Sequence, residues 1–101
     1  MMKATLLYHH PVDPQAFERY YAQTHLPLAA KMAGVARLEL TRFAPGPDGS
    51  RPVFYKMAEL YFAAAAQMQT TLGSPEGQVA VADLQNFATG GVTALTGAVE
   101  S

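Results

Sequence analysis

His25 is the residue of this sequence that is best suited to acid–base chemistry. It lies within the stretch Asp13–Gly34, four residues after Tyr21 and two residues before Pro27. The unperturbed pKa of histidine is close to neutrality, so this side chain can accept or release a proton at physiological pH. The alternative is a structural histidine that bonds backbone groups freed by the proline. His25 is therefore a candidate general acid or base, with the structural role left open.

Tyrosine hydroxyls are a second source of polar chemistry. Tyr20 and Tyr21 are about 100° apart on a helix, so both can border one apolar stripe. Tyr8, Tyr55 and Tyr61 fall in segments that are predicted to be strands. As a set, these side chains can line a cavity for a flat, mostly apolar ligand that a few hydroxyls orient. For each tyrosine taken alone, the alternative is a position in the core or at an interface.

The sequence offers little support for a metal site or a nucleotide-binding site. His9 and His10 are adjacent, and adjacent strand residues point to opposite faces, so the two cannot easily share one ion. The sequence has no cysteine, which excludes thiolate metal sites, disulfides and a cysteine nucleophile. It also contains no G-x-S-x-G, P-loop, G-x-G-x-x-G or H-E-x-x-H motif. We therefore expect a site that works without a cofactor or a metal.

Composition indicates a small globular protein and argues against two classes of partner. The 101 residues suit one domain, 1–101, and half of them are hydrophobic. The formal net charge is −1 and the charges are scattered, so we expect no binding to nucleic acid or to an anionic membrane surface. No run approaches the ~18 apolar residues of a membrane-spanning helix. The lack of cysteine fits a cytoplasmic location, which is our expectation.

The helix that carries His25 has recognisable start and end signals. Asp13 is a favourable N-cap, and Pro14 is tolerated at the first helical position. Pro27 lacks an amide hydrogen and its ring crowds the preceding turn, so we expect a kink or break near His25–Leu26. Helix should then resume and end at Gly34, a natural C′ residue.

The other segments complete a familiar order of elements. Strands are predicted at 3–8, 35–43, 53–62 and 92–99, helices at 63–72 and from 74 to about 85, and a mobile hairpin loop at 44–52. The order βαββαβ predicts an α+β, ferredoxin-like fold, with an antiparallel four-stranded sheet and both helical segments on one face.

The third strand, 53–62, indicates how chains assemble. Residues of both parities along it are largely apolar, whereas a sheet with one wet face should alternate cleanly. Two helical segments cover only one face of so small a sheet, so a second copy of the chain is predicted to cover the other. Glu59, on this strand, is expected to pair across that dimer with Arg37 or Arg42.

Four segments of the chain carry a family likeness: DPQAFERYYAQTHLPLAAKMAGV, ELYF, SPEGQ and DLQNFATGGV. In these segments the sequence resembles the EthD family, small proteins named for ether degradation, within the dimeric α/β-barrel superfamily. The resemblance implies that two ferredoxin-like sheets meet face to face as a homodimeric barrel with the helices outside. Its relatives include cofactor-free monooxygenases, lactone isomerases and haem-degrading enzymes, so it implies a fold more firmly than a reaction.

The resemblance also implies a pocket between the first helix and the sheet, used in a catabolic pathway for a small apolar or aromatic ligand. If the protein is an enzyme, we expect cofactor-free proton transfer or oxygenation of an aromatic or ketone-bearing substrate, with His25 moving the proton. The residues expected to contact ligand are Tyr8, Tyr21, Tyr61, Asn86 and Phe87.

Other interpretations stay open beside this one. Asn86 can equally be a turn residue, and Asp83, which also fits the family pattern, can be a solvated residue on a helix surface. A non-catalytic accessory or metabolite-binding dimer is the main functional alternative. An RNA-binding sheet is disfavoured, because the third strand lacks a Lys/Arg-Gly start and the net charge is −1.

Overall fold

All 101 residues are described by a computed structural model. The strands are β1 (Met2–Tyr8), β2 (Arg37–Arg42), β3 (Lys56–Phe62) and β4 (Val92–Ala98). They form one antiparallel sheet in the order β2-β3-β1-β4. The helices are α1 (Pro14–Tyr20), η1 (Tyr21–His25), α2 (Leu26–Ala29), α3 (Ala65–Gly73) and α4 (Pro75–Phe87). This is the ferredoxin-like α+β arrangement that the sequence predicts.

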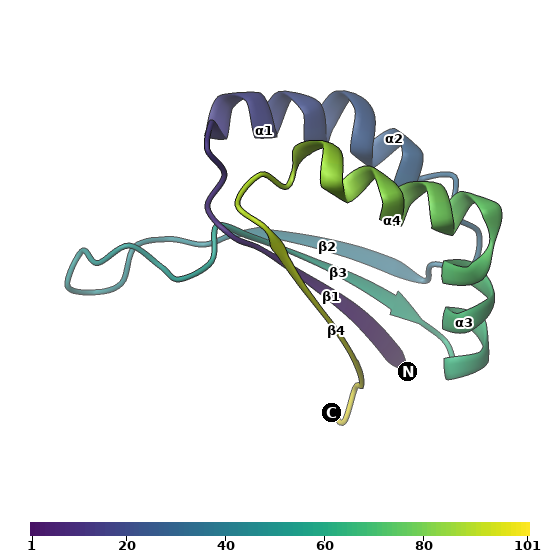
Figure 1. Ribbon diagram of the computed structural model, residues 1–101. Helices are drawn as coiled ribbons and strands as arrows, with labels where there is room; N and C mark the ends of the chain where they lie inside the picture. The colour runs from purple at the N-terminus through teal and green to yellow at the C-terminus, as the bar shows by residue number, and fades with distance from the viewer.

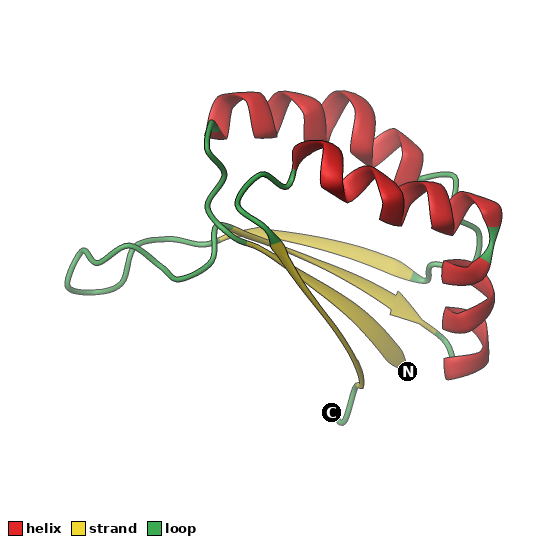
Figure 2. Cartoon of the chain, in the orientation of Figure 1, coloured by secondary structure: helices red, strands yellow, loops and turns green.

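The helices gather on one side of the sheet. Figures 1 and 2 show α1, α2 and α4 lying over one face, with α3 beside one end of the strands. The register pairs even-numbered residues with even-numbered ones, for example Ala4 with Leu60 and Tyr8 with Lys56. Tyr8, Ala4 and Leu60 are buried beneath the helices, so even-numbered strand residues face the helices. Odd-numbered residues face the opposite side, which no helix covers (Figure 1).

The face without helices is more polar than the sequence pattern suggested. The ammonium group of Lys3 lies 2.7 Å from a carboxylate oxygen of Glu59. The hydroxyl of Tyr61 donates to Glu39 at 3.3 Å, and the guanidinium of Arg37 lies 4.2 Å from the centre of the Tyr61 ring. Glu59 thus has a cationic partner, Lys3, within its own chain, and its pairing with Arg37 or Arg42 across a dimer stays a prediction. The homodimer itself stays a prediction.

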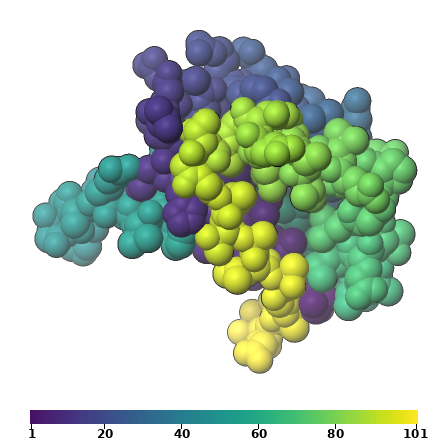
Figure 3. Space-filling model, in the orientation of Figure 1, coloured from purple at the N-terminus to yellow at the C-terminus, as the bar shows by residue number.

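Strand β3 is shorter than predicted and follows a long loop. It begins at Lys56 rather than at residue 53, and β2 ends at Arg42. Residues 43–55 between them protrude from the body of the molecule (Figures 1 and 3). The strand pairing continues briefly into this loop, because the amide of Phe43 donates to the carbonyl of Tyr55 at 3.2 Å.

The first helical segment stays continuous past Pro27. Asp13 caps its start by accepting from the amide of Ala16 at 3.1 Å, as predicted. In place of a kink or break, the chain forms a π turn, η1, in which the amide of Leu26 donates to the carbonyl of Tyr21. The wider turn accommodates a proline that cannot donate to the usual carbonyl.

The predicted helix end at Gly34 is wrong, because α2 ends at Ala29 and turns follow it. Gly34 lies in one of these turns with a φ of +94°, where an added side chain would also collide with Gln67. Ser74 caps α4 by accepting from the amide of Gly77 at 3.1 Å. Helix α4 runs two residues beyond the predicted end, to Phe87. The buried ring of Phe87 packs on Tyr8 at the end of β1.

Candidate functional site

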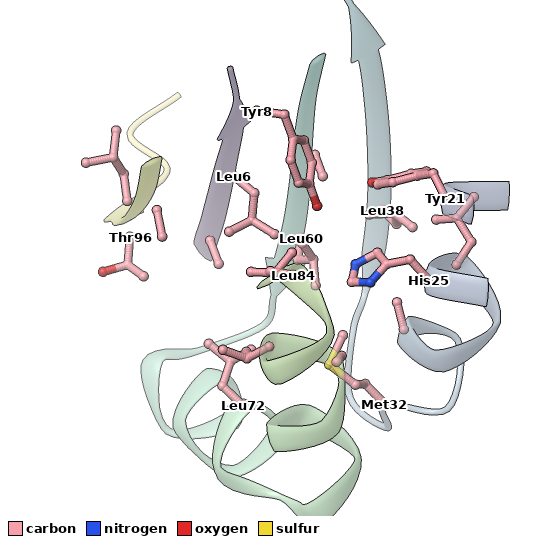
Figure 4. Close-up of a pocket in the computed structure, with 18 residues that line it drawn as sticks. Leu6, Tyr8, Tyr21, His25, Met32, Leu38, Leu60, Leu72, Leu84 and Thr96 are labelled. Carbon is pink, nitrogen blue, oxygen red and sulfur yellow. The ribbon is translucent and has the colours of Figure 1, made fainter. Parts of the chain in front are cut away.

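A cavity of about 170 Å³ lies between the helix-facing side of the sheet and the helices above it. Sixteen of its 18 lining residues are hydrophobic, and the other two are His25 and Thr96. Figure 4 shows His25 and Tyr21 on one wall, with Leu6, Leu60 and Leu84 among the side chains across from them. A largely apolar space with a few polar groups is the usual composition of a small-molecule site.

The π turn carries Tyr21 at its start and His25 at its end, and both line the cavity. Residues four apart differ by only about 40° around a regular α-helix, so their spacing already places the two side chains close together. Both side chains are buried, with ring centroids 5.3 Å apart.

His25 is held by a buried carboxylate. Its Nδ1 atom lies 3.0 Å from Oδ2 of Asp83, and each side chain is only 6% exposed. Burial raises the pKa of Asp83, but hydrogen bonds from Tyr20, Asn86 and His25 outweigh it and lower the pKa below its ordinary value. An ionised carboxylate only accepts hydrogen bonds, so we assign the hydrogen to Nδ1 of His25. In the neutral ring, Nε2 is then a free acceptor.

Two further donors secure Asp83. The hydroxyl of Tyr20 donates to Oδ1 at 2.6 Å, and the amide nitrogen of Asn86 donates to the same oxygen at 3.0 Å. With Nδ1 of His25, three donors stabilise the buried charge of Asp83, and such hydrogen bonds offset the cost of removing it from water. The imidazole of His25 is therefore oriented by a carboxylate that is itself fixed in place.

Tyr8 contributes a hydroxyl with unused hydrogen-bonding capacity. Its side chain is fully buried, and its hydroxyl has no hydrogen-bond partner. A buried polar group without a partner typically costs about 1–3 kcal/mol. Figure 4 shows the hydroxyls of Tyr8 and Tyr21 pointing toward the same space beside His25, although no hydrogen bond joins them.

Both tyrosines stay protonated at neutral pH. Burial raises the pKa of Tyr8 far above its ordinary value, and burial raises the pKa of Tyr21 to about 12. A protonated phenol is a hydrogen-bond donor. The cavity therefore presents two hydroxyl donors and one imidazole acceptor against an otherwise apolar lining.

Aromatic packing limits the movement of these groups. The Tyr8 ring packs against Phe17, Tyr21 and Phe87, with centroid separations of 5.4, 5.6 and 5.7 Å. Phe87 also lies 4.6 Å from the His25 ring. Such aromatic pairs each contribute about 0.5–1.5 kcal/mol beyond their burial. Phe87 therefore packs against both polar side chains, Tyr8 and His25, and limits their movement.

A second cluster of charges lies on the other side of Tyr21. Glu18 accepts from Lys56 at 2.7 Å and from Tyr55 at 2.6 Å, and it pairs with Arg42 at 2.7 Å. Lys56 is buried, with its ammonium 4.5 Å from the centre of the Tyr21 ring. Burial raises the pKa of Glu18, but these partners outweigh it, so the pKa lies below the ordinary value. None of the charged members of this cluster lines the cavity.

Comparison with known proteins decides the family. The model for the EthD domain matches residues 9–91 of this chain. The chain belongs to the EthD family. An "uncharacterized 11.0 kDa protein in thcB-thcC intergenic region" of Rhodococcus erythropolis is 43% identical over 99 residues, 94% of this chain and 91% of that protein. The resemblance inferred from the sequence is thus confirmed.

Solved structures agree with this membership. An ethyl tert-butyl ether d (EthD) family protein from Bacillus halodurans C-125 is 33% identical, covers 99% of both chains and gives a TM-score of 0.92. SnoaB, a cofactor-independent oxygenase from Streptomyces nogalater, shares the fold at 17% identity and a TM-score of 0.67, over 99% of this chain and 92% of that one. Dimeric ferredoxin-like proteins are also among the structural neighbours. No helix of this EthD protein is both long enough and apolar enough to cross a membrane.

The structure brings together three of the residues predicted for the site. His25, Tyr8 and Tyr21 all line the cavity of this EthD protein. Asn86 and Phe87 do not line it, but with Tyr20 they border a separate groove near the start of α1. Asn86 acts through Asp83 and Phe87 through ring packing.

Tyr61, the remaining predicted contact, lies on the face of the sheet without helices. Its position follows from strand alternation, because an odd-numbered residue of β3 cannot face the same side as Ala58 and Leu60. It therefore does not reach the cavity. The sequence alone does not determine which side of each strand faces the helices.

Asp83 is a site residue that the sequence pattern did not single out. The sequence allows a solvated position on a helix surface, yet Asp83 is buried and holds His25. The buried residues of α4 are Gly77, Ala80, Asp83 and Phe87, which recur at helical spacing along one side. A carboxylate on this apolar stripe was the available signal, since an unpaired charge is rarely buried.

Proposed function

We propose that this EthD protein binds a small, mostly apolar organic molecule and uses His25 as a general base for cofactor-free proton transfer. The observation that carries the proposal is the contact between Nδ1 of His25 and the buried carboxylate of Asp83. It leaves Nε2 as an acceptor on the wall of an apolar cavity. Sixteen hydrophobic residues around it favour an aromatic or ketone-bearing compound.

The residues support a simple reaction step. Nε2 of His25 removes a proton from a carbon next to a carbonyl group. The electron pair of the broken C–H bond forms a carbon–carbon double bond, and the carbonyl π electrons move onto oxygen. Asp83 stabilises the imidazolium that results. Return of the proton to another carbon would complete an isomerisation, with no change in oxidation state.

The lining residues offer little else for catalysis. His25 is the one imidazole among them, and no carboxylate, thiol or amine accompanies it. The lining thus presents at most one strong metal ligand, which fits a reaction carried by side chains alone. The cofactor-independent oxygenase SnoaB shares the fold. An oxygenase reaction here would use the same first proton transfer, with dioxygen as co-substrate.

The wider setting belongs to the same proposal. The name of the family refers to ethyl tert-butyl ether, and a role in a catabolic pathway is the setting we propose. A second copy of the chain is proposed to cover the sheet face that lacks helices, as the dimeric neighbours support. Each chain would then hold its own cavity beneath its own helices.

Hydrogen–deuterium exchange tests the proton transfer without a known substrate. Acetophenone carries exchangeable methyl protons beside its carbonyl, and NMR in deuterated buffer follows their loss. We expect the protein to accelerate exchange and His25→Gln to reduce that acceleration by at least about a hundredfold, the usual size of general-base catalysis.

A second histidine supplies the matched control. His10 lies outside the cavity, where its Nε2 contacts the carbonyl of Pro52 at 2.7 Å. His10→Gln should therefore leave exchange unchanged. Equal loss of exchange in both variants, or none in His25→Gln, would contradict the proposal. Saturable binding of acetophenone with no exchange at all would favour the non-catalytic alternative.

A further inference from the structure

The hydroxyl of Tyr8 stands apart from the other buried polar groups of the molecule. It is the one buried side-chain oxygen or nitrogen atom without a hydrogen-bond partner. Its side chain is fully buried, and it lines the cavity. Buried hydroxyls usually find a partner, so an exception at a cavity wall points to a bond that a ligand completes.

The position of Tyr8 on a central strand makes it a fixed donor. β1 pairs with β3 on one side and β4 on the other, and Tyr8 lies opposite Lys56 and Val92. Its ring is enclosed by Phe17, Tyr21 and Phe87. Burial raises the pKa of this hydroxyl, so it donates throughout the neutral range. A fixed donor favours an acceptor oxygen at one place in the cavity.

The charges around the cavity disfavour an anionic ligand. No lysine or arginine lines it, and the buried ammonium of Lys56 is committed to Glu18 at 2.7 Å. The carboxylate of Asp83 lies directly behind His25, which adds negative potential to the same wall. A ligand carboxylate would lose its hydration without gaining a cation in return. An uncharged oxygen meets no such penalty.

The size of the cavity limits the ligand to about one ring. Its volume is about 170 Å³, and an engineered apolar cavity of about 150 Å³ is sufficient to bind benzene. A single six-membered ring with one small oxygen-bearing group therefore fits. A fused polycyclic compound would extend past the exposed lining residues Leu38, Val81 and Leu95 into solvent.

We propose that the ligand is an uncharged carbonyl compound of single-ring size, and that the Tyr8 hydroxyl donates to its carbonyl oxygen. This inference rests on the proposed function and names the substrate class of the same site. The oxygen held by Tyr8 is the atom that gains negative charge when His25 takes the proton. A donor aimed at that atom stabilises the developing oxyanion as well as the bound ligand.

Three probes of nearly the same shape separate these requirements. Acetophenone has the carbonyl, α-methylstyrene replaces its oxygen with a methylene group, and benzoate replaces its methyl group with a charged oxygen. Dissociation constants are measured by NMR titration for the wild-type protein and for Tyr8→Phe. Comparing the ratio between proteins cancels the different hydration of the probes, as in a double-mutant cycle.

Removal of one hydroxyl should abolish the selectivity for the carbonyl. We expect the ratio of the α-methylstyrene constant to the acetophenone constant to fall about tenfold in Tyr8→Phe, equivalent to roughly 1.4 kcal/mol. Tyr61→Phe, on the other face of the sheet, should leave the ratio unchanged. Benzoate should show no saturable binding at concentrations that saturate with acetophenone.

The stability of Tyr8→Phe gives an independent readout. Because the hydroxyl has no partner, its removal should leave the melting temperature equal or higher. A clear decrease would show that the hydroxyl is already bonded within the protein, and it would overturn the inference. An unchanged ratio, binding of benzoate comparable to acetophenone, or no binding of acetophenone would each overturn it as well.

The two proposals fail in different ways. His25→Gln should abolish exchange while keeping the carbonyl selectivity, and Tyr8→Phe should abolish the selectivity. An unchanged ratio in Tyr8→Phe with exchange that still depends on His25 would overturn the Tyr8 inference alone. A tenfold change of ratio in a protein that catalyses no exchange would support Tyr8 as the ligand contact and contradict His25 as the base.

Discussion

Asp83 and Glu18 are carboxylates with closely similar surroundings and different positions relative to the cavity. Each accepts one tyrosine hydroxyl, from Tyr20 or Tyr55, and each contacts two nitrogen donors. Each also has a pKa below its ordinary value, because its partners outweigh the effect of burial. The side chain of Glu18 is 29% exposed, whereas that of Asp83 is 6% exposed.

The two clusters differ in whether one of their nitrogen donors keeps an unused atom at the cavity wall. The ammonium of Lys56 contacts Glu18 and the ring of Tyr21, and Lys56 itself does not line the cavity. His25 uses only one ring nitrogen on Asp83, so the second nitrogen stays available at the cavity wall. A saturated cluster stabilises the fold, and a cluster with an unused atom at a cavity can also perform chemistry. The variants below test that distinction.

Of the changes to the two carboxylates, Asp83→Asn should have the largest effect, a loss of exchange activity. An asparagine amide can donate to Nδ1 of His25 and so place the ring hydrogen on Nε2, which can then no longer accept a proton. We expect exchange of acetophenone to fall on the order of ten- to a hundredfold, within the range of general-base effects. NMR exchange rates measure it.

Tyr20→Phe is the matched control for Asp83→Asn. It removes another hydrogen bond to Asp83 and leaves the bond to His25 in place. Exchange should then change by less than about threefold. If Asp83→Asn matched the wild-type rate, Asp83 would have no positioning role, and the two carboxylates would be functionally alike.

Glu18→Gln should show the opposite behaviour, a loss of stability with activity retained. Buried Lys56 would lose its anionic partner, which is costly, although partial exposure of Glu18 reduces the penalty. We expect a decrease of about 1–2 kcal/mol in the free energy of unfolding. Urea denaturation measures it, with acetophenone exchange followed in parallel.

Arg42→Gln controls for the exposed end of the same cluster. The Arg42 side chain is 58% exposed, and exposed ion pairs contribute about 0–1 kcal/mol. Its effect on stability should be clearly smaller than that of Glu18→Gln. A Glu18→Gln variant with normal stability and impaired exchange would show that this cluster, too, serves the site.

The smallest of the three effects is the contribution of Asp83 to the pH dependence of stability, which appears only at acidic pH. The pKa of Asp83 is lowered in the folded protein, whereas an unfolded aspartate titrates near ~3.9. The unfolded chain therefore binds protons first as pH falls, so this stabilisation is complete above about pH 5 and is lost as pH drops through the lower folded pKa. Melting temperatures from pH 7 to pH 3 should fall more steeply for the wild-type protein than for Asp83→Asn. Parallel curves would mean that Asp83 contributes nothing to acid sensitivity.

The fold was predictable because its signals are local. Asp13 and Ser74 cap helices, Gly34 takes a positive φ in a turn before β2, and alternating residues mark β2. Each signal depends on neighbours within about one turn or one strand. The π turn was not predictable in the same way, since Pro27 can produce a kink, a break or a wider turn.

The site was predicted in part. His25 and Tyr21 lie on one helical segment, so their proximity follows from spacing. Asp83 is 58 residues away from His25 along the chain. Its burial depends on how α4 packs beside the first helical segment, and no local pattern determines that packing. The prediction that Tyr61 contacts the ligand was wrong for a related reason, because the sequence does not determine which side of the sheet the helices cover.

The sequence by itself determined the order of elements, the family and the presence of a histidine on an apolar helix face. Those properties arise from composition, periodicity and short-range caps. Only the tertiary structure decided that even-numbered strand residues face the helices, that Asp83 holds His25, and that the Tyr8 hydroxyl lacks a partner. The physical reason is that each depends on packing between segments distant in sequence. A local pattern indicates which side of a segment is buried, but not which side chains it will meet there.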